Sequence, residues 1–327
     1  MTKVAILGAG AWGSALANML VGTDTHVSLW GHNPATLDAI ARSHSNERYL
    51  PGIQLSAALQ FEPDLAAAVD GAHFVIVSVP SRAFRQVSQS LKDFEGVAVS
   101  VTKGLEYKTG LTMSGILRET APKAKVAALS GPTLAPEVAR GIPAAIVAAS
   151  ACAETALQVQ RLLHRPQFRV YTSSDVRGVE LGGALKNVIA ISAGICDGLG
   201  FGDNSKAALV TRSLAEIRRL GVACGAQPET FSGLSGLGDL MVTCFSRLSR
   251  NRSFGERLGR GEKLETVVAT APSVAEGYPT ARSAHDVARR LNISTPVIDE
   301  VYSVLYEGKN PAQALRDLTA RDLKAED

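Results

Sequence analysis

A glycine-rich loop near the N-terminus is the feature that most limits how this chain can fold. The apolar run Val4–Leu7 leads into Gly8-Ala-Gly10-Ala-Trp-Gly13, and a helical pattern continues over Trp12–Leu20. In a strand–loop–helix of this kind, the first glycine permits a tight turn and the second lets a pyrophosphate approach the backbone. The third glycine allows the helix to pack closely on the strand. Because the amides at the helix start face such an anion, the segment predicts a dinucleotide-binding unit.

Strand and helix patterns alternate through the first half of the chain. The strand candidates are rich in Val and Ile with little polar alternation, which is typical of strands buried on both faces. We expect strands at Val4–Leu7, Val27–Trp30, Phe74–Val79, Val97–Val101, Val126–Leu129, Ala145–Ala149 and Arg169–Tyr171, with a weaker one near Leu59–Phe61. We expect helices at Trp12–Leu20, Pro34–Ser43, Ser81–Leu91, Leu111–Thr120 and Glu154–Leu163. This order predicts a Rossmann-like, doubly wound parallel sheet.

The pattern becomes helical beyond Ser174. We expect helices at Asp175–Ala193, Ser205–Gly221, Ser253–Leu258, Tyr278–Leu291, Val297–Tyr306 and Pro311–Leu318. A chain of 327 residues is long enough for two domains. The expected fold class is therefore α/β, with a Rossmann-like nucleotide-binding domain over residues 1–175 and an all-α substrate and catalytic domain over residues 176–327. The joint falls at the start of a helix, so we expect the two domains to be closely docked.

Composition excludes several classes of protein. The 34 Lys and Arg residues nearly balance 31 Asp and Glu, and the net charge of +3 suggests neither a nucleic-acid partner nor a stable membrane association. The glycines within Met1–Thr23 argue against a signal peptide or anchor, and we expect no other segment to approach the roughly 20 apolar residues of a membrane span. The 4 cysteines form no CxxC pair and the 6 histidines no HExxH motif, so no metal site is expected. Such thiols suit a reducing cytoplasm, which is the expected location.

The end of the second strand indicates which dinucleotide is bound. An acidic residue there would bind the adenine ribose of NAD(H), but the segment is Ser28-Leu-Trp-Gly-His32-Asn33. Asp24 lies before the strand, and Asp38 lies inside the next helix. His32 and Arg42 are nearby candidates to face a 2′-phosphate, so the sequence favours NADP(H), with NAD(H) as the alternative. An ordinary solvent-exposed loop histidine explains His32 equally well.

A lysine stands alone in an apolar segment of the helical half. Lys186 is the only charged residue between Leu181 and Cys196, and Gly182 and Gly183 leave the face beside it open to close approach. A partly desolvated lysine has a lowered pKa and exchanges a proton near neutral pH, as the reduction of a ketone requires. A lysine that reaches solvent from a buried helix is an equally good interpretation.

A carboxylate stands alone in a second uncharged segment. Asp239 lies in Gly236-Leu-Gly-Asp239, within the stretch Phe231–Phe245. One interpretation is that Asp239 only caps the start of a helix. The other is that its charge orients Lys186 and tunes its pKa.

Three further segments place polar groups where ligands bind. Lys103 and Ser130-Gly-Pro-Thr133 each follow an expected strand, at the carboxyl edge of the sheet. Arg247-Leu-Ser-Arg-Asn-Arg252 combines cations, a hydroxyl and an amide at an expected helix start, a combination that suits a phosphate. Taken alone, each of the two basic segments is more typical of a solvated loop or turn than of a ligand site.

Together these motifs resemble those of the bacterial NAD(P)-dependent glycerol-3-phosphate dehydrogenases. The matching segments are Gly8-Ala-Gly-Ala-Trp-Gly13, Thr102-Lys-Gly104, Ser130-Gly-Pro-Thr133, Glu180-Leu-Gly-Gly-Ala-Leu-Lys-Asn-Val-Ile-Ala190, Gly236-Leu-Gly-Asp239 and Ser249-Arg-Asn-Arg252. Their order and spacing agree over nearly the whole chain. The resemblance implies an oxidoreductase that reversibly reduces dihydroxyacetone phosphate to sn-glycerol 3-phosphate, the backbone precursor of phospholipids.

The resemblance also implies roles for individual residues. Lys186 is the implied proton donor and acceptor, and Asp239 completes the catalytic pair. The implied substrate-binding residues are Lys103, Gly131, Thr133, Lys186, Asp239, Ser249, Arg250 and Asn251. The implied cofactor-binding residues are Gly8, Gly10, Ala11, Trp12, Gly13, His32, Lys103, Ala135, Arg250, Val274 and Glu276. Ala11 departs from the common pattern, which often has Ser there, so a hydroxyl contact with the pyrophosphate is lost while a backbone contact remains.

Two other classes of protein stay open. A dehydrogenase acting on a hydroxy acid or a sugar acid would hold a carboxylate, which Arg250 also suits. A catalytically silent NADP(H)-sensing protein would bind the cofactor without turnover, although the presence of both Lys186 and Asp239 argues against it. The oligomeric state is open as well, with a homodimer as one candidate.

Overall fold

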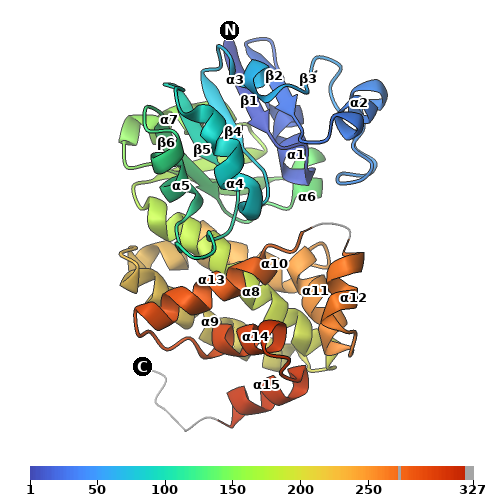
Figure 1. The fold of residues 1–327 in the computed structure, drawn as a ribbon, viewed down its shortest axis with the longest axis vertical. Coiled ribbons are helices and arrows are strands. Elements are labelled where there is room, and N and C mark those ends of the chain that lie inside the picture. Colours follow the sequence, from blue (N-terminus) through green and yellow to red (C-terminus); the bar gives the residue numbers. More distant parts are fainter. Residues whose placement is uncertain (272–273, 321–327) are drawn as a thin grey trace.

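The computed structural model describes residues 1–271 and 274–320, and Figure 1 shows an α/β domain beside a helical domain. One eight-stranded sheet forms the first domain, with strand order β3-β2-β1-β4-β5-β6-β7-β8. The strands are β1 (Thr2–Leu7), β2 (Thr25–Trp30), β3 (Gln60–Glu62), β4 (Phe74–Val77), β5 (Val97–Ser100), β6 (Lys125–Ser130), β7 (Ala144–Ala149) and β8 (Phe168–Ser173). Each expected strand is confirmed, the weak one included, with small shifts at the ends.

Both faces of this sheet are buried. In β1, Val4 and Ile6 belong to the hydrophobic core on one face, whereas Ala5 and Leu7 belong to the core on the other. All four side chains are fully buried. Successive strand residues point to opposite faces, so a strand covered on both sides needs an uninterrupted apolar run.

The expectation of an entirely parallel sheet is wrong at one strand pair. β7 runs antiparallel to β6, with Ala128 opposite Ala149 and Ser130 opposite Val147. The connection between them contains only the five-residue helix α6 (Ala135–Ala139). A parallel crossover usually runs through a helix that covers the length of the sheet, and α6 is too short to provide it. The remaining neighbouring strands pair in parallel.

Helices of the first domain connect its strands. They are α1 (Ala11–Leu20), α2 (Pro34–Ser43), α3 (Leu65–Val69), α4 (Ser81–Ser88), α5 (Met113–Thr120), α6 and α7 (Ala153–Leu163). The ends of α2 follow its sequence, because Asn33 accepts a hydrogen bond from the Thr36 amide and Pro34 occupies the first turn. The sequence did not predict α3 and α6, because five residues are too few to show a helical period.

The second domain is helical, as expected. Its helices are α8 (Val176–Gly198), α9 (Asp203–Ala223), α10 (Asp239–Phe245), α11 (Arg250–Gly259), α12 (Leu264–Thr270), α13 (Gly277–Arg290), α14 (Pro296–Tyr306) and α15 (Pro311–Thr319). The sequence indicated a start for α10 near Asp239, whereas α12 was not predicted. Beyond Ser173, no strand occurs in the part of the chain that the structure describes.

Helix α8 is the central element of the second domain, and α9, α11 and α13 lie around it (Figure 1). By length and hydropathy it could cross a membrane, contrary to the expectation that only the N-terminal stretch comes close to this. Its most apolar window is nevertheless entirely buried within the protein. The apolar composition of α8 is therefore explained by its place in the core.

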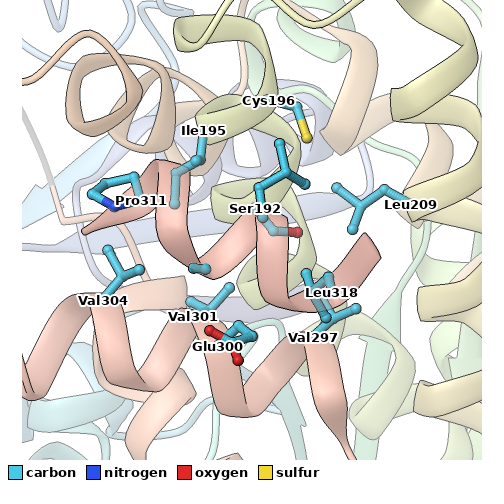
Figure 2. A pocket seen from close by; sticks show the side chains of 12 residues that line it. Ser192, Ile195, Cys196, Leu209, Val297, Glu300, Val301, Val304, Pro311 and Leu318 are labelled. Atoms are coloured by element: carbon cyan, nitrogen blue, oxygen red, sulfur yellow. The ribbon is translucent and has the colours of Figure 1, made fainter. Parts of the chain in front are cut away.

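The last described helix covers one end of this core. Asn310 caps α15 by accepting hydrogen bonds from the Ala312 and Gln313 amides. Figure 2 shows Leu318 of α15 facing side chains of α8 and α14 across a small gap. The gap has a volume of only about 20 Å³, which is room for roughly one water.

Candidate active site

The glycine loop after β1 has the geometry that its sequence predicts. Gly8 has a φ of +128°, and a Cβ there would lie 2.5 Å from the carbonyl oxygen of Ser78. A Cβ on Gly13 would lie 1.9 Å from the carbonyl oxygen of Gly8. Glycine is therefore required at both positions by the fold itself.

Gly10 differs from the other two glycines. Its φ of −82° is open to any residue, and a Cβ there would meet nothing within 4 Å. Gly10 is also the N-cap of α1, and within the described residues no side-chain hydrogen bond caps this helix. The space before the helix start is thus left clear, as a pyrophosphate would require, so the residues present fit a dinucleotide.

The other expected cofactor residues of this domain lie on two sides of the loop. Ala11 and Trp12 form the first turn of α1, and Trp12 and Ala135 both pack against the same face of the sheet. His32 is exposed directly after β2. Arg42 lies ten residues further on, in the last turn of α2, about 12 Å of helix rise beyond Pro34. The structure therefore favours His32 over Arg42 as the residue beside a ribose phosphate.

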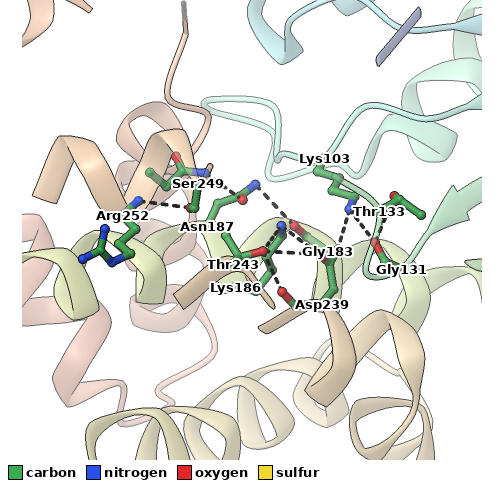
Figure 3. A network of polar contacts seen from close by, with 11 residues as sticks. Lys103, Gly131, Thr133, Gly183, Lys186, Asn187, Asp239, Thr243, Ser249 and Arg252 are labelled. Atoms are coloured by element: carbon green, nitrogen blue, oxygen red, sulfur yellow. Dashed lines mark hydrogen bonds and ion pairs between the residues drawn. The ribbon is translucent and has the colours of Figure 1, made fainter. Parts of the chain in front are cut away.

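A buried polar network joins the two domains. Asp239 Oδ1 lies 2.9 Å from Lys186 Nζ, and Asp239 Oδ2 lies 2.5 Å from Lys103 Nζ. Lys186 also donates a hydrogen bond of 2.6 Å to Thr243 Oγ1, which in turn donates to the backbone oxygen of Asp239. Figure 3 shows the three charged side chains converging from α8, from α10 and from the loop after β5. Lys186 and Asp239, far apart in the sequence, thus form one ion pair.

Burial controls the charge of this lysine. Only 6% of Lys186 and 1% of Asp239 are exposed. Desolvation, helped by the positive charge of Lys103 and opposed by the negative charge of Asp239, lowers the pKa of Lys186 from 10.5 to about 8. Because Lys186 is buried, it does not reach solvent, and a pKa of about 8 suits proton exchange near physiological pH.

Backbone packing places both members of the pair. A Cβ on Gly183 would lie 2.3 Å from Ser130 Oγ, and a Cβ on Gly182 would lie 2.6 Å from the Ser235 carbonyl oxygen. The two glycines thus let α8 approach the end of β6 and the segment before α10, as expected. A π-helical turn, Leu234–Gly238, immediately precedes Asp239. Such turns are frequent at functional sites.

The helix-capping interpretation of Asp239 is wrong. Asp239 is the first residue of α10, Gly238 is the N-cap, and no side chain makes the capping hydrogen bond. Its carboxylate is instead shared between the ammonium groups of Lys103 and Lys186. A single buried carboxylate between two cations is well compensated, and it fixes the distance between them.

The loop after β6 completes this side of the site. The carbonyl oxygen of Gly131 accepts hydrogen bonds from Lys103 Nζ at 3.0 Å and from Thr133 Oγ1 at 3.2 Å. Lys103, Gly131 and Thr133 are therefore brought together, as expected. Lys103 is held by this carbonyl group and by Asp239, so it is no ordinary solvated lysine.

The start of α11 holds the expected phosphate-binding residues. Ser249 caps the helix through a hydrogen bond from the Arg252 amide. Arg250 is exposed in part, and desolvation of its guanidinium lowers its pKa against the opposing charge of Glu276. Asn251 donates to Asn187 Oδ1 at 2.9 Å and accepts from the Gly277 amide at 2.9 Å. Asn187 adjoins Lys186 on α8, so these contacts link the start of α11 to the helix that carries Lys186.

Arg252 lies apart from this group. Its Nε is 2.6 Å from Asp197 Oδ2, and its Nη1 is 3.1 Å from Glu256 Oε2. In Figure 3 its guanidinium points away from Lys186 and Asp239. The cations of the 247–252 run therefore do not act as one cluster, since Arg252 serves an internal contact.

Glu276 connects the domains at a second point. Its carboxylate accepts hydrogen bonds from the amide and the hydroxyl of Ser81, at 3.2 and 2.5 Å. A Cβ on Gly104, next to Lys103, would lie 3.5 Å from the same carboxylate. Val274, two residues before Glu276, is partly buried. Glu276 thus lies where α4 begins after β4, at the carboxyl edge of the sheet.

Three residues of this site had no assigned role in the sequence. Thr243 follows Asp239 by one helical turn, and that spacing is the signal that places both on one face. Asn187 is adjacent to Lys186, but its contact with Asn251 is long-range. Ser81 carried no signal, because its partner Glu276 lies 195 residues away.

A Rossmann-like sheet with a glycine loop open to a dinucleotide, docked on a helical domain through a buried lysine–aspartate pair, defines a two-domain nicotinamide-dependent dehydrogenase. The sequence matches the model described as NAD-dependent glycerol-3-phosphate dehydrogenase N-terminus over residues 3–156, and the corresponding C-terminus model over residues 175–316. The chain belongs to this family of glycerol-3-phosphate dehydrogenases, as the motifs predicted.

Individual relatives agree over their full lengths. The chain is 45% identical over 330 residues to a protein of Chlorobium phaeobacteroides (strain BS1) named glycerol-3-phosphate dehydrogenase [NAD(P)+], and the match covers 99% of each. It is 47% identical over 330 residues to a protein of that name from Anaeromyxobacter sp. (strain K), again over 99% of each. The crystal structure of glycerol-3-phosphate dehydrogenase from Coxiella burnetii superposes with a TM-score of 0.94 at 37% identity, covering 98% of this chain and 99% of that one.

Proposed function

We propose that this chain reversibly reduces dihydroxyacetone phosphate to sn-glycerol 3-phosphate, with NADPH as the preferred reductant and NADH as the alternative. The product would supply glycerophospholipid synthesis. The observation that carries the proposal is the buried Lys186 ammonium, held by Asp239 and Thr243 at the junction of the two domains. Membership of the family supports the same substrate.

Lys186 is the proposed acid of the reduction. With a pKa of about 8, it is largely protonated at neutral pH and gives its proton to the ketone oxygen of the substrate. In the reverse direction the neutral amine removes the proton of the C2 hydroxyl. Asp239 and Thr243 fix the position of Nζ throughout, so the proton is delivered to one defined point.

The start of α11 is the proposed site for the substrate phosphate. Arg250 offers a guanidinium fork, Asn251 retains one free amide hydrogen, and Ser249 contributes the helix start. Lys103, Gly131 and Thr133 would line the opposite side of the substrate. These groups bind a dianionic end between a helix N-terminus and cations, which suits a phosphate monoester.

The dinucleotide would lie along the carboxyl edge of the sheet. Gly8, Gly10, Ala11, Trp12 and Gly13 would hold its pyrophosphate, His32 its adenine-ribose end, and Ala135, Val274 and Glu276 further contacts. Lys103 and Arg250 would lie near both ligands. When bound, the nicotinamide supplies the hydride for C2 of the substrate.

Three further expectations are carried as part of the proposal. We place the domain boundary at residues 175–176, because Asp175 caps α8 through the Gly178 amide directly after β8. We propose a cytoplasmic location, where a reduced nicotinamide and a sugar phosphate are both at hand. A homodimer is the proposed assembly, and a measurement of mass in solution tests it.

The test of the function is direct. Purified protein is mixed with dihydroxyacetone phosphate and either NADPH or NADH, and the absorbance of the reduced nicotinamide is followed. Rapid oxidation of NADPH supports the proposal and ranks the two cofactors. Protein that binds NADPH but oxidises neither cofactor would instead favour a silent sensor, and turnover confined to a panel of hydroxy acids or sugar acids would favour the other class of dehydrogenase.

A further inference from the structure

A second buried ion cluster lies on the helices that carry the proposed phosphate site. Lys206 of α9 places Nζ 2.8 Å from both carboxylate oxygens of Asp197, on α8. Asp197 Oδ2 is also 2.6 Å from Arg252 Nε, on α11. Only 5% of Lys206 is exposed, so the cluster is internal. Three helices therefore meet at one carboxylate.

A fourth helix touches the same cluster. Lys206 Nζ lies 4.9 Å from the ring centroid of Phe245, the last residue of α10. α10 carries Asp239 and Thr243, and α11 carries Ser249, Arg250 and Asn251. Asp197 and Lys206 thus contact, directly or through one neighbour, every helix that supplies a proposed catalytic or substrate-binding residue in the second domain.

The backbone contact between α8 and α11 does not by itself fix the position of α11 along α8. A Cβ on Gly194 would lie 1.9 Å from the Arg252 carbonyl oxygen, and a Cβ on Gly255 would lie 1.9 Å from that of Ile191. The two helices therefore touch through backbone, with no side chain between them at these points. A smooth contact of this kind sets the distance between helices, but it opposes sliding along the axis only weakly. The ion pair between Arg252 and Asp197 opposes it, in addition to the hydrogen bond from Asn251 to Asn187.

We propose that Asp197, Lys206 and Arg252 are positioning residues, which hold the start of α11 where it receives the phosphate end of the substrate. Arg252 is the third residue of α11, and its amide is the group that Ser249 caps. A shift of α11 along α8 would move Ser249, Arg250 and Asn251 together, away from Lys186. The proposal rests on the proposed function, because it assigns the phosphate to this helix start.

The experiment compares Arg252→Met with wild-type enzyme, because this variant removes the ion pair between α11 and α8. Methionine keeps an apolar stem at this position, and Asp197 still has Lys206 as its partner, so the carboxylate is not left unpaired. We expect the KM for dihydroxyacetone phosphate to rise about tenfold or more, since small displacements of binding groups have large effects. Competitive inhibition by inorganic phosphate should weaken in parallel. The KM for NADPH should be unchanged, and kcat should change much less than the KM for dihydroxyacetone phosphate.

A control on the same helix separates positioning from general damage. Arg257 Nη2 and Glu262 Oε2 form an ion pair of 2.6 Å near the far end of α11, more exposed to solvent. Glu262→Gln breaks this pair and should leave both the KM and the inhibition by phosphate unchanged. If Arg252→Met does not fold, Arg252→Lys takes its place, because it keeps the charge but loses the guanidinium fork.

Two results would overturn the inference. The first is a variant with unaltered KM for dihydroxyacetone phosphate and unaltered inhibition by phosphate. The second is a fall in kcat alone, accompanied by a lower Tm, which would mark a purely structural role. Wild-type enzyme that fails to reduce dihydroxyacetone phosphate would be a different outcome, because it contradicts the proposed function rather than the positioning.

Discussion

Asp239 binds two lysines at once, with Lys186 Nζ 2.9 Å from one carboxylate oxygen and Lys103 Nζ 2.5 Å from the other. One lysine belongs to the helical domain and the other follows a strand of the sheet. The ion pair that sets the charge of the proposed acid is therefore also a bond between the domains. The proposed proton transfer and the docking of the two domains therefore both depend on the side chain of Asp239.

Replacing the proposed acid should abolish most turnover and leave cofactor binding intact. Lys186→Ala removes the group proposed to protonate the ketone, and loss of general acid–base catalysis typically costs about 10²–10⁴-fold in kcat. The glycine loop lies in the other domain, so NADPH affinity, measured by nucleotide fluorescence, should change little. Turnover equal to that of wild type would remove Lys186 from the mechanism.

The pH profile should report the lowered pKa of Lys186. Reduction needs the ammonium form, so kcat/KM for dihydroxyacetone phosphate should be level below about pH 8 and fall above it. Oxidation of glycerol 3-phosphate needs the neutral amine and should rise with pH up to about 8. Asp239→Asn removes the charge that favours the ammonium, so the residual activity of that variant should decline from a lower pH. A profile unmoved by Asp239→Asn would contradict the electrostatic role.

Two substitutions in the glycine loop should separate ligand binding from folding. Gly10→Ala places a methyl group in open space, so stability to urea should hold while NADPH affinity falls about tenfold, or 1.4 kcal/mol. Gly13→Ala forces a methyl group against the Gly8 carbonyl oxygen and should lower the free energy of unfolding by about 1–3 kcal/mol or more. Equal effects of the two substitutions on stability would show that the space before Gly10 is not open.

Cofactor preference should respond to His32 more than to Arg42. A negative charge beside a 2′-phosphate is repelled, so His32→Asp should shift the NADPH-to-NADH ratio of kcat/KM about tenfold towards NADH. Arg42→Asp makes a larger change in charge, but in the last turn of α2, away from the strand end. Steady-state kinetics of both variants with both cofactors shows which substitution has the larger effect on cofactor preference. A larger effect at Arg42 would reverse the assignment.

The parts of this molecule that depend on local sequence could be predicted, and those that depend on distant partners could not. Uninterrupted Val and Ile runs identified the strands, and Gly8, Gly10 and Gly13 identified the nucleotide loop, because each effect acts within a few residues. The reversal of β7 depends on the length of α6, which is too short for hydrophobic periodicity to reveal. Lys186 and Asp239 were conspicuous as isolated charges, but their pairing required the fold. Ser81 could not be identified from the sequence, because a serine after a strand is common and its contact with Glu276 appears only in the folded structure.

The reversed strand β7 has a consequence for how Lys186, the proposed acid, is placed. β8 runs parallel to β7, so it ends at the opposite edge of the sheet from the carboxyl ends of β1 to β6. Helix α8 therefore starts beside the sheet rather than beyond its carboxyl edge, and Val176 and Val179 pack there with Ala128 and Ala149. It passes the end of β6 at Gly183 and reaches Lys186 after about 15 Å of helix rise. The hydrophobic contact at the start of α8 therefore sets how far along the helix axis Lys186 lies from the sheet. One residue inserted between Val179 and Gly183 would turn Lys186 by about 100° away from Asp239, while leaving every side chain of the active site chemically unchanged.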